Sequence, residues 1–385
     1  MRQRGFTLIE LLVALGVAAM LGLFIFASYS AISVGGLRAS DESAEQNSAR
    51  VGITLLADDL SRAGFMMNGP SGQNRCSRLL VYNGNTNANT MLSMWPVSAV
   101  QQTTSGQVPG TTTSFGYANP GGAATDAVSV FYAAGFGIGN STIPGGVNVV
   151  KANNGTLNNA SLFVADTSSF QAGDVDIVVL PSRNLCIRFQ VSNVGGGNNI
   201  VHNSGAGSAN INPPNGFNGV SSLANPPVSP AITATDLQQA FVQNFGQIQG
   251  ASGPLQVTYS IRPDRQNSAM PDLWRTVVNS LGQTVSDVPV VQNVVLLHAL
   301  FAPIQGNGQI GSFVPWSTIV SNNQQGQVGA VRFALLVRKP NTGNRTNNPA
   351  SIAVLDETFT PPGPQFQYQL YTQTVYLRNV AWNAS

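Results

Sequence analysis

Charged residues are scarce in this chain. Lys, Arg, Asp and Glu make up 9% of its 385 residues, whereas about a quarter is typical of globular domains. The formal net charge is only +2, and Lys and Arg form no compact cluster interleaved with aromatic residues. That pattern marks a groove for a nucleic-acid backbone, so we expect no nucleic-acid partner. The abundant Gly (40), Pro (22) and neutral polar residues instead predict a turn-rich surface of the kind common outside the cytoplasm.

Histidines and catalytic motifs are equally scarce. His202 lies in a Gly/Asn-rich segment and His298 in an apolar run; we interpret them as a solvated loop histidine and a strand histidine with a satisfied hydrogen bond. Asp174 and Asp176 could touch calcium, but two carboxylates at this spacing usually flank a strand without a metal. Gly135–Gly139 lacks the final spacing of a phosphate-binding loop. No nucleophile, zinc or paired-carboxylate motif stands out, so we expect neither an enzyme nor a cofactor.

Cysteine is limited to Cys76 and Cys186. Their spacing excludes a CxxC redox or zinc motif. In an exported body, an even pair predicts one disulfide. It would close a loop of about 110 residues, worth up to about 4.7 kcal/mol in the chain-entropy model. Two free buried thiols are the alternative.

The amino terminus, MRQRGFTLIE, carries the most informative pattern. A short basic leader ends at Gly5, and Phe6 opens an apolar run interrupted only by Glu10; the next charge is Arg38. Because roughly 20 apolar residues cross a bilayer, this run predicts a membrane helix with the basic leader inside and the body outside. A carboxylate costs about 2.5–3.5 kcal/mol at the centre of such a helix, so Glu10 needs a partner. A cut between Gly5 and Phe6 creates an α-ammonium that supplies one.

The segment Arg4–Glu10 resembles the class III signal of type IV prepilins and type II secretion pseudopilins. In that superfamily, a membrane aspartyl peptidase cuts after the glycine and N-methylates the new phenylalanine, and the glutamate helps to register a subunit in the growing filament. The resemblance implies cleavage between Gly5 and Phe6, methylation of Phe6 and an assembly role for Glu10. A cleaved signal peptide or a plain single-pass anchor is the alternative, but neither explains these residues.

The helix is predicted to continue past the membrane, over residues 6–65, with Gly35-Gly36 as a weak point at which it can bend. The alternative is a second helix that starts near residues 40–42. Asp58 and Arg62 predict an exposed i,i+4 ion pair. Apolar residues in the second half recur at three- and four-residue spacing, which predicts packing on the body: Ile53, Leu56 and Leu60.

Beyond residue 66 the hydrophobic period changes from helical to two, as in strands with one buried face. In the run 185–191 this alternation places Cys186 and Arg188 on the more polar face. We favour one sheet-based body with long insertions over two domains. Strands are predicted over 128–132, 177–180, 185–191, 255–261, 290–300, 331–337 and 366–377. Gly-, Asn- and Pro-rich loops are predicted over 83–90, 101–125, 193–230, 303–312 and 339–350.

Several body segments resemble, in their order, the PilW-like minor pilins. Each motif is loose by itself, and the insertions at 101–125 and 193–230 have no counterpart in that family. The matching segments are 170–174, 186–191, 257–262, 273–275, 291–295, 328–338 and 374–379.

These observations together predict an α+β, pilin-like fold. A leader (1–5) precedes a long helix (6–65), transmembrane in its first half, which packs on a large antiparallel, periplasmic β-sheet body (66–385). The resemblance implies a minor pilin that primes a type IV pilus and lies at or near its tip. Its expected partners are other minor and major pilins, the prepilin peptidase, the inner-membrane assembly platform and a tip adhesin. The precursor is expected in the inner membrane, and the processed protein in the surface pilus.

Two other functions stay open at this point. A J-like minor pseudopilin of type II secretion carries the same leader, although the PilW-like carboxyl-terminal motifs favour the pilus. A membrane-anchored periplasmic binding or adhesive module would use the loops to bind sugar or protein, and it predicts an uncut leader.

Overall fold

The computed structural model describes residues 8–64, 78–84, 88–93, 95–133, 147–151, 161–204, 211–214, 216–217, 224–225, 228–247, 254–279, 283–340 and 349–381. The chain divides into two compact units, Met1–Val51 and Gly52–Ser385. The unit boundary falls inside helix α1, which runs from Leu8 to Ser61. Within the described residues, no helix combines the length and the mean hydropathy needed for a membrane crossing.

The first unit consists of the amino-terminal part of α1, and large apolar side chains are exposed along it. Leu12 is 61% exposed and Phe24 is 77% exposed. Soluble monomers rarely expose apolar surface on this scale, which usually marks contact with another protein or with lipid. The exposed side chains are Leu8, Ile9, Leu11, Leu12, Val13, Leu15, Val17, Met20, Leu21, Leu23, Phe24 and Phe26.

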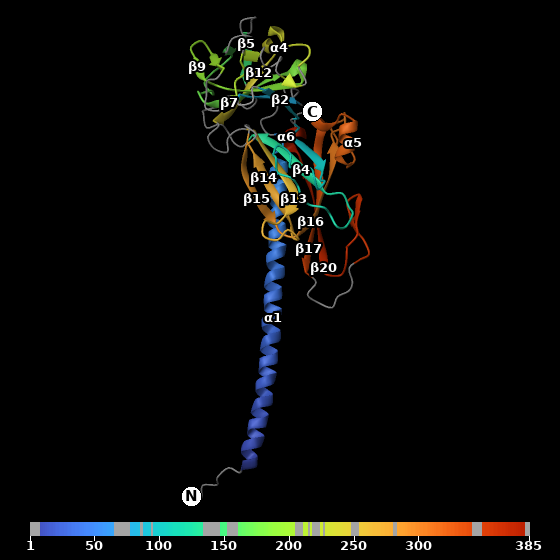
Figure 1. The fold of residues 1–385 in the computed structure, drawn as a ribbon. Helices are drawn as coiled ribbons and strands as arrows, with labels where there is room; N and C mark the ends of the chain where they lie inside the picture. Colours follow the sequence, from blue (N-terminus) through green and yellow to red (C-terminus); the bar gives the residue numbers. More distant parts are fainter. Residues whose placement is uncertain are drawn as a thin grey trace. The chain divides into compact units, whose positions relative to one another are not determined.

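The second unit is rich in β-structure and contains a ten-stranded sheet (Figure 1). Its order is β11-β2-β1-β8-β7-β12-β5-β6-β10-β9. Neighbours pair antiparallel except for β1 with β8 and β11 with β2, which are parallel. The strands are β1 (Arg78–Asn83), β2 (Ala88–Ser93), β5 (Val147–Lys151), β6 (Ser161–Val164), β7 (Asp174–Leu180), β8 (Leu185–Gln190), β9 (Asn193–Gly195), β10 (Asn199–Val201), β11 (Ala224–Asn225) and β12 (Phe241–Gln247).

A five-stranded antiparallel sheet has the order β15-β14-β13-β4-β3 (Figure 1). Strand β16 of a three-stranded antiparallel sheet, β16-β17-β20, packs against β4, β13 and β14. Strands β18 (Ile352–Val354) and β19 (Glu357–Phe359) form a separate hairpin. The remaining strands are β3 (Val97–Gln101), β4 (Asp126–Ala133), β13 (Pro254–Pro263), β14 (Pro271–Val278), β15 (Thr284–Val291), β16 (Val294–Pro303), β17 (Val328–Pro340) and β20 (Phe366–Tyr376).

Short helices complete the second unit. A 3-10 turn, η1, joins β7 to β8 and carries proline at its start, where a missing N–H is tolerated. Helix α4 begins with a capping box between Thr233 and Asp236, which satisfies donors at the helix start. The elements are η1 (Pro181–Arg183), α4 (Ala234–Gln238), α5 (Trp316–Ser321), η2 (Gln325–Gln327) and α6 (Arg378–Ala381).

The large antiparallel sheets confirm the predicted β-rich body, whereas the predicted membrane-spanning first half of the helix is not shown. One predicted strand is wrong. Residues 290–300 are split between β15, which ends at Val291, and β16, which begins at Val294. Asn293 lies between them with a φ of 58°, a left-handed conformation that asparagine tolerates better than most residues. At this residue the chain leaves the five-stranded sheet and enters the three-stranded one.

The expectation that only one face of a strand is buried is wrong for β8. All residues of β8 and all residues of β7 are buried, so both faces of this part of the sheet are covered. Cys186 is fully buried and Arg188 is 4% exposed. The alternation in the sequence therefore reflects one apolar face and one buried polar face.

Candidate functional site

The residues predicted to direct processing lie at the margin of the described chain. Gly5 and Phe6 are outside it, and the backbone of Glu10 belongs to α1 while its side chain is not described. Their cleavage, methylation and assembly roles stay predictions.

The part of α1 that belongs to the second unit packs closely on the body. Leu56 and Leu60 are fully buried, as their spacing predicted. Gly52 lies so close to β15 that an added Cβ would be 2.0 Å from Cγ2 of Val291. A side chain larger than hydrogen at this position therefore requires the helix or the strand to shift.

Asp59 is the polar centre of this contact. Its carboxylate is 4% exposed and accepts hydrogen bonds from two tyrosines: Tyr132 donates to Oδ1 and Tyr259 to Oδ2, each at 2.6 Å. Arg275 donates from Nε to Oδ2 at 2.8 Å and from Nη2 to Oδ1 at 3.2 Å. Two-point pairing of this kind fixes direction as well as distance. We call Asp59, Tyr132, Tyr259 and Arg275 the helix anchor.

The helix anchor draws on three neighbouring strands. Tyr132 comes from β4, Tyr259 from β13 and Arg275 from β14. Tyr259 and Arg275 are register partners, and the arginine Nε also lies 3.2 Å from the tyrosine hydroxyl. One side chain of α1 is thereby bonded across the middle of the five-stranded sheet.

Electrostatics favour a neutral pair of tyrosines around one ion pair. Burial, and then the negative charge of Asp59, raise the pKa of Tyr132 and Tyr259 above the usual value for tyrosine, so both hydroxyls remain donors. Burial alone lowers the pKa of Arg275, but its hydrogen bonds and attraction to Asp59 outweigh this and raise it. The guanidinium therefore keeps its charge next to the carboxylate.

The carboxyl-terminal end of α1 is capped by the body. Gly64 has a φ of 73°, the left-handed conformation that commonly ends helices, and its N–H donates to the Phe131 carbonyl at 2.8 Å. The Asn379 amide donates at 3.3–3.4 Å to three carbonyls that a helix end leaves unpaired. These carbonyls belong to Ser61, Arg62 and Ala63.

Two family models match this chain. The prokaryotic N-terminal methylation motif matches residues 1–26, and type IV pilus-assembly protein W matches residues 258–379. The two matches support a type IV pilin-like protein similar to PilW. Residues 27–257 lie outside both matches. No curated protein and no solved structure matches the chain significantly.

The PilW match includes half of the helix anchor. Tyr259, Arg275 and the capping Asn379 lie inside it, whereas Asp59 and Tyr132 lie outside. The segments around Tyr259 and Arg275 resemble the family in sequence, but their sequence indicates no role for them. Asp59 was not predicted, although a carboxylate three residues after buried Leu56 and next to Leu60 occupies the apolar face of the helix. A carboxylate on the apolar face of a helix indicates that the body supplies a buried hydrogen-bonding or oppositely charged partner.

The exposed pair predicted on the same helix is confirmed. Arg62 Nη2 lies 2.8 Å from the Asp58 carboxylate, and both side chains are more than half exposed. Asp58 and Asp59 are thus adjacent carboxylates with opposite environments.

His298 lies between two carboxylates of this PilW-like body. Its Nδ1 is 2.7 Å from Asp126 and its Nε2 is 2.7 Å from Asp356. Burial lowers the pKa of the imidazole, but both carboxylates counteract it and raise the pKa to about 9. Asp126 also accepts from the Ala299 N–H at 3.0 Å. The expected hydrogen bond of this strand histidine is confirmed at Nε2, and the two carboxylates hold the imidazole as a cation at neutral pH.

His202 contradicts the prediction of a solvated loop residue. It is 1% exposed, and its ring centroid lies 5.2 Å from that of Phe189 and 4.6 Å from that of Phe217. Burial lowers its pKa to about 4. The residue directly follows β10, and its ring packs in a cluster with Phe189 and Phe217. The neighbouring Gly and Asn residues in the sequence gave no indication of this packing.

Asp174 and Asp176 both lie in β7 and are buried. Burial raises the pKa of Asp176 well above its usual value, and the charge of Asp174 adds to the effect. Among the described residues, no group of three or more His, Cys, Asp or Glu side chains is placed to hold a metal ion. Gly135–Gly139 lies outside the described residues.

The predicted disulfide concerns one described cysteine. Cys186 is fully buried in β8, and no cysteine in the described part of the chain is a free thiol. Cys76 lies outside that part, so its pairing with Cys186 stays a prediction.

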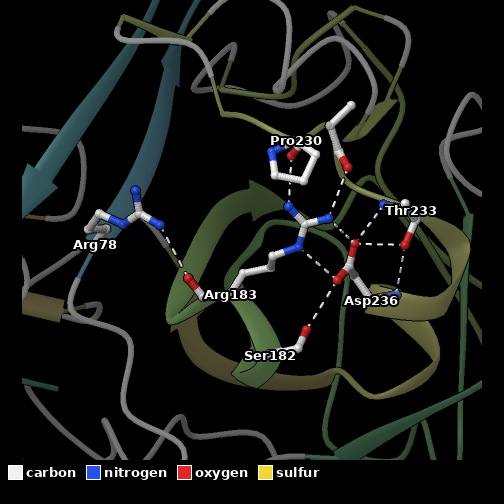
Figure 2. Close-up of polar contacts among 7 residues, drawn as sticks. Arg78, Ser182, Arg183, Pro230, Thr233 and Asp236 are labelled. Atoms are coloured by element: carbon white, nitrogen blue, oxygen red, sulfur yellow. Dashed lines mark hydrogen bonds and ion pairs between the residues drawn. The ribbon is translucent and has the colours of Figure 1, made fainter.

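A second charged cluster fastens the segment before α4 to the turn between β7 and β8 (Figure 2). Arg183 pairs with both oxygens of Asp236 at 2.7–2.8 Å. It also donates to the carbonyls of Pro230 and Ala231 at 2.7 and 3.0 Å. Arg183 and the hydroxyl of Thr233 hold the pKa of Asp236 well below its usual range, against the opposing effect of burial. The bonds of Arg183 and Asp236 drawn in Figure 2 all go to other residues of the chain, which is the pattern of a structural contact.

Proposed function

We propose that this chain is a minor pilin that primes assembly of a type IV pilus and is incorporated at or near its tip. The observation that carries the proposal is the methylation motif over residues 1–26. It coincides with the stretch of α1 whose large apolar side chains are exposed from Leu8 to Phe26. A surface of this kind suits a precursor held in the inner membrane and a processed subunit packed among other pilin helices.

Processing is proposed between Gly5 and Phe6, with N-methylation of Phe6 by the prepilin peptidase. Cleavage creates an α-ammonium at Phe6, and Glu10 offsets that charge in the same subunit or a neighbouring one. An ion pair of this type is strong when it is dry and hydrogen-bonded, and a missing partner leaves a buried charge uncompensated. The Phe6 ammonium and Glu10 therefore direct how deeply a subunit enters the filament core.

The helix anchor supports the same role from the body side. A subunit that is held in a fibre through its helix needs a fixed connection from that helix to its sheet. Asp59 provides it through bonds to Tyr132, Tyr259 and Arg275. The proposed role is structural and not enzymatic; its partners are other minor and major pilins, the inner-membrane assembly platform and a tip adhesin.

A J-like minor pseudopilin of type II secretion is the second candidate, because it shares the methylation motif. The match of residues 258–379 to type IV pilus-assembly protein W favours the pilus. The third candidate is a membrane-anchored periplasmic binding or adhesive module that never polymerises. This function requires an intact leader.

Intact mass and amino-terminal sequencing of the protein from sheared surface fibres and from membranes test the proposal. A chain that begins at methylated Phe6 in the fibre fraction supports the minor pilin. The same processed chain confined to membranes favours the pseudopilin, and an intact Met1 contradicts processing altogether.

Replacing Glu10 with alanine tests the assembly role. We expect the Glu10→Ala protein to be processed and stable in the membrane but absent from sheared fibres, because the Phe6 ammonium loses its counter-charge. Glu45→Ala is the matched control, since Glu45 belongs to the same helix and lies outside the methylation motif. Normal incorporation of the Glu10→Ala protein, measured by immunoblot of the sheared fraction, would contradict an assembly role for Glu10.

A further inference from the structure

A cleft of about 550 Å³ opens between the insertion at residues 101–125 and the hairpin β18–β19. From the hairpin, Glu357 at the start of β19 lines the cleft. The volume lies inside the range of roughly 300–1,000 Å³ that is typical of small-molecule sites. Neither family model includes residues 101–125, so family membership assigns this cleft no role.

The insertion that forms most of the cleft has a defined internal structure. Its base is closed by the Gln102 N–H, which donates to the Thr125 carbonyl at 2.7 Å. Val108 and Phe115 are fully buried against Ala127 in a small core of their own. Structureless connections of this length are uncommon in compact domains, and those that order themselves are frequently functional. Ordering costs about 1–2 kcal/mol per residue in backbone entropy, and these contacts act against that cost.

The insertion is also tied to the hairpin. The Thr360 N–H donates to the Gly121 carbonyl at 3.1 Å, and an added Cβ at Gly121 would meet the Phe359 ring at 2.1 Å. The Asn119 side chain accepts from the Gly121 N–H and donates to the Ala123 carbonyl, each at 3.0 Å. Both sides of the cleft are therefore in place before any ligand arrives.

His298 strengthens this arrangement from beneath. Its ring contacts Asp126, the residue after the cleft-lining Thr125, and Asp356, the residue before the cleft-lining Glu357. One imidazole thus links the end of the insertion to the turn of the hairpin. A preorganised site loses less free energy to ordering on binding.

The lining is polar and almost uncharged. Amide and hydroxyl side chains are the commonest type in it, namely Gln101, Gln102, Thr103, Thr104, Asn119 and Thr125, and Glu357 adds one carboxylate. The amides of Gln102 and Asn119 are bonded within the protein, to the Ile261 backbone and to the insertion itself. No Lys, Arg or His is among the described residues that form its wall, which disfavours an anionic ligand. A single carboxylate is too little for a hard divalent cation, which takes six or more oxygens in the case of calcium. Most small-molecule pockets are predominantly apolar, and this one is not.

We propose that the cleft binds a neutral saccharide. Hydroxyl-rich rings both donate and accept hydrogen bonds without net charge, and so do the side chains of Gln101, Thr103 and Thr104 in the lining. Glu357 is placed to accept from ring hydroxyls. Tyr117 donates its own hydroxyl to the Val295 carbonyl at 2.9 Å, so its half-buried ring contributes a fixed apolar surface on which the C–H side of a sugar can pack. This binding is separate from the proposed role in assembly.

Saturation-transfer NMR on the full-length protein in a zwitterionic detergent without a sugar headgroup tests the proposal. The probes are cellotriose, chitotriose and maltotriose as neutral trisaccharides and trigalacturonate as the charged counterpart, each up to about 20 mM, well above a Kd of about 1 mM. We expect saturation of at least one neutral probe and none of trigalacturonate, which Glu357 repels.

Three variants locate the binding. Glu357→Gln should weaken it at least tenfold, and Ala118→Trp should abolish it by filling the cleft at an exposed lining position. Thr358→Ala is the matched control, because its exposed side chain neighbours Glu357 on the same strand and does not line the cleft. No binding of any neutral probe, undiminished binding to Ala118→Trp, or preference for trigalacturonate overturns the proposal. If a Thr/Ser-rich peptide binds the protein and the sugars do not, the saccharide proposal is overturned in favour of a protein ligand.

Discussion

At the scale of single residues, Asp59 and Asp58 show how environment decides what a carboxylate contributes. Asp59 is 4% exposed and bonded to three side chains, whereas Asp58 is 51% exposed and pairs with Arg62 alone. Exposed ion pairs contribute about 0–1 kcal/mol, while removing one partner of a buried pair costs about 3–5 kcal/mol.

The first prediction compares these neighbours. Asp59→Asn should lower the free energy of unfolding by up to about 3 kcal/mol, because Arg275, whose side chain is 23% exposed, loses its counter-charge. Asp58→Asn, the matched control, should change it by at most about 1 kcal/mol. Denaturant unfolding of the detergent-solubilised protein, followed by near-UV circular dichroism, measures both. Equal losses in the two variants would contradict the role of the helix anchor.

His298 predicts how stability depends on pH. Its pKa is about 9 in the folded protein and about 6.5 when exposed in the unfolded chain. A raised pKa stabilises the folded state fully below the unfolded value, and this contribution fades as pH rises through the folded value. We therefore expect His298 to stabilise the protein less and less between pH 6.5 and 9, by up to about 3 kcal/mol in total.

The measurement is the difference in unfolding free energy between wild type and His298→Asn across this pH range. The difference should shrink as pH rises. His202→Phe serves as a contrast, because burial lowers the pKa of His202 to about 4. The protonation of His202 therefore reduces stability only as pH decreases below 6.5. A wild-type minus His298→Asn difference that stays constant with pH would refute the assignment of the cation.

At the scale of elements, the packing of α1 on β15 depends on the absence of a side chain at Gly52. Alanine usually stabilises a helix relative to glycine by about 1 kcal/mol. At Gly52 the new Cβ would lie 2.0 Å from Val291, and overpacking costs about 1–3 kcal/mol. We expect Gly52→Ala to be destabilising on balance.

Gly16→Ala on the same helix is the matched control, because an added Cβ there meets nothing within 4 Å. It should leave the midpoint of thermal unfolding unchanged or raise it. If Gly52→Ala behaves like Gly16→Ala, the contact between helix and strand is looser than its geometry indicates.

The sequence predicted the strands well where one face is apolar. The alternation at 255–261 corresponds to β13, and the runs at 331–337 and 366–377 correspond to β17 and β20. It failed at Asn293, because an uninterrupted apolar run does not reveal the residue at which a chain changes sheets. It failed again at Arg188, because burial of a polar face depends on segments that are distant in the chain.

The same division applies to the candidate sites. The processing signal is a continuous motif, so Gly5, Phe6 and Glu10 could be read directly. The helix anchor joins Asp59 to residues more than 70 positions away, and no local pattern encodes that pairing. The cleft depends on how residues 101–125 fold back on Glu357, which the sequence left as a loop without a role.

At the scale of the whole molecule, the predicted disulfide would link the segment after α1 to the centre of the ten-stranded sheet. Cys76→Ala and Cys186→Ala should each lower the unfolding free energy by about 2–5 kcal/mol. The double variant should cost little more than either single one, because both remove the same bond. Non-reducing peptide mass spectrometry should recover one cross-linked peptide, and additive losses in the double variant would argue for two independent thiols.

The helix anchor also determines how the subunit carries mechanical tension. In the proposed fibre, the part of a pull along α1 that reaches Asp59 is shared among β4, β13 and β14 through Tyr132, Tyr259 and Arg275. Because three adjacent strands hold the same carboxylate, the force is not concentrated on the hydrogen bonds of one strand.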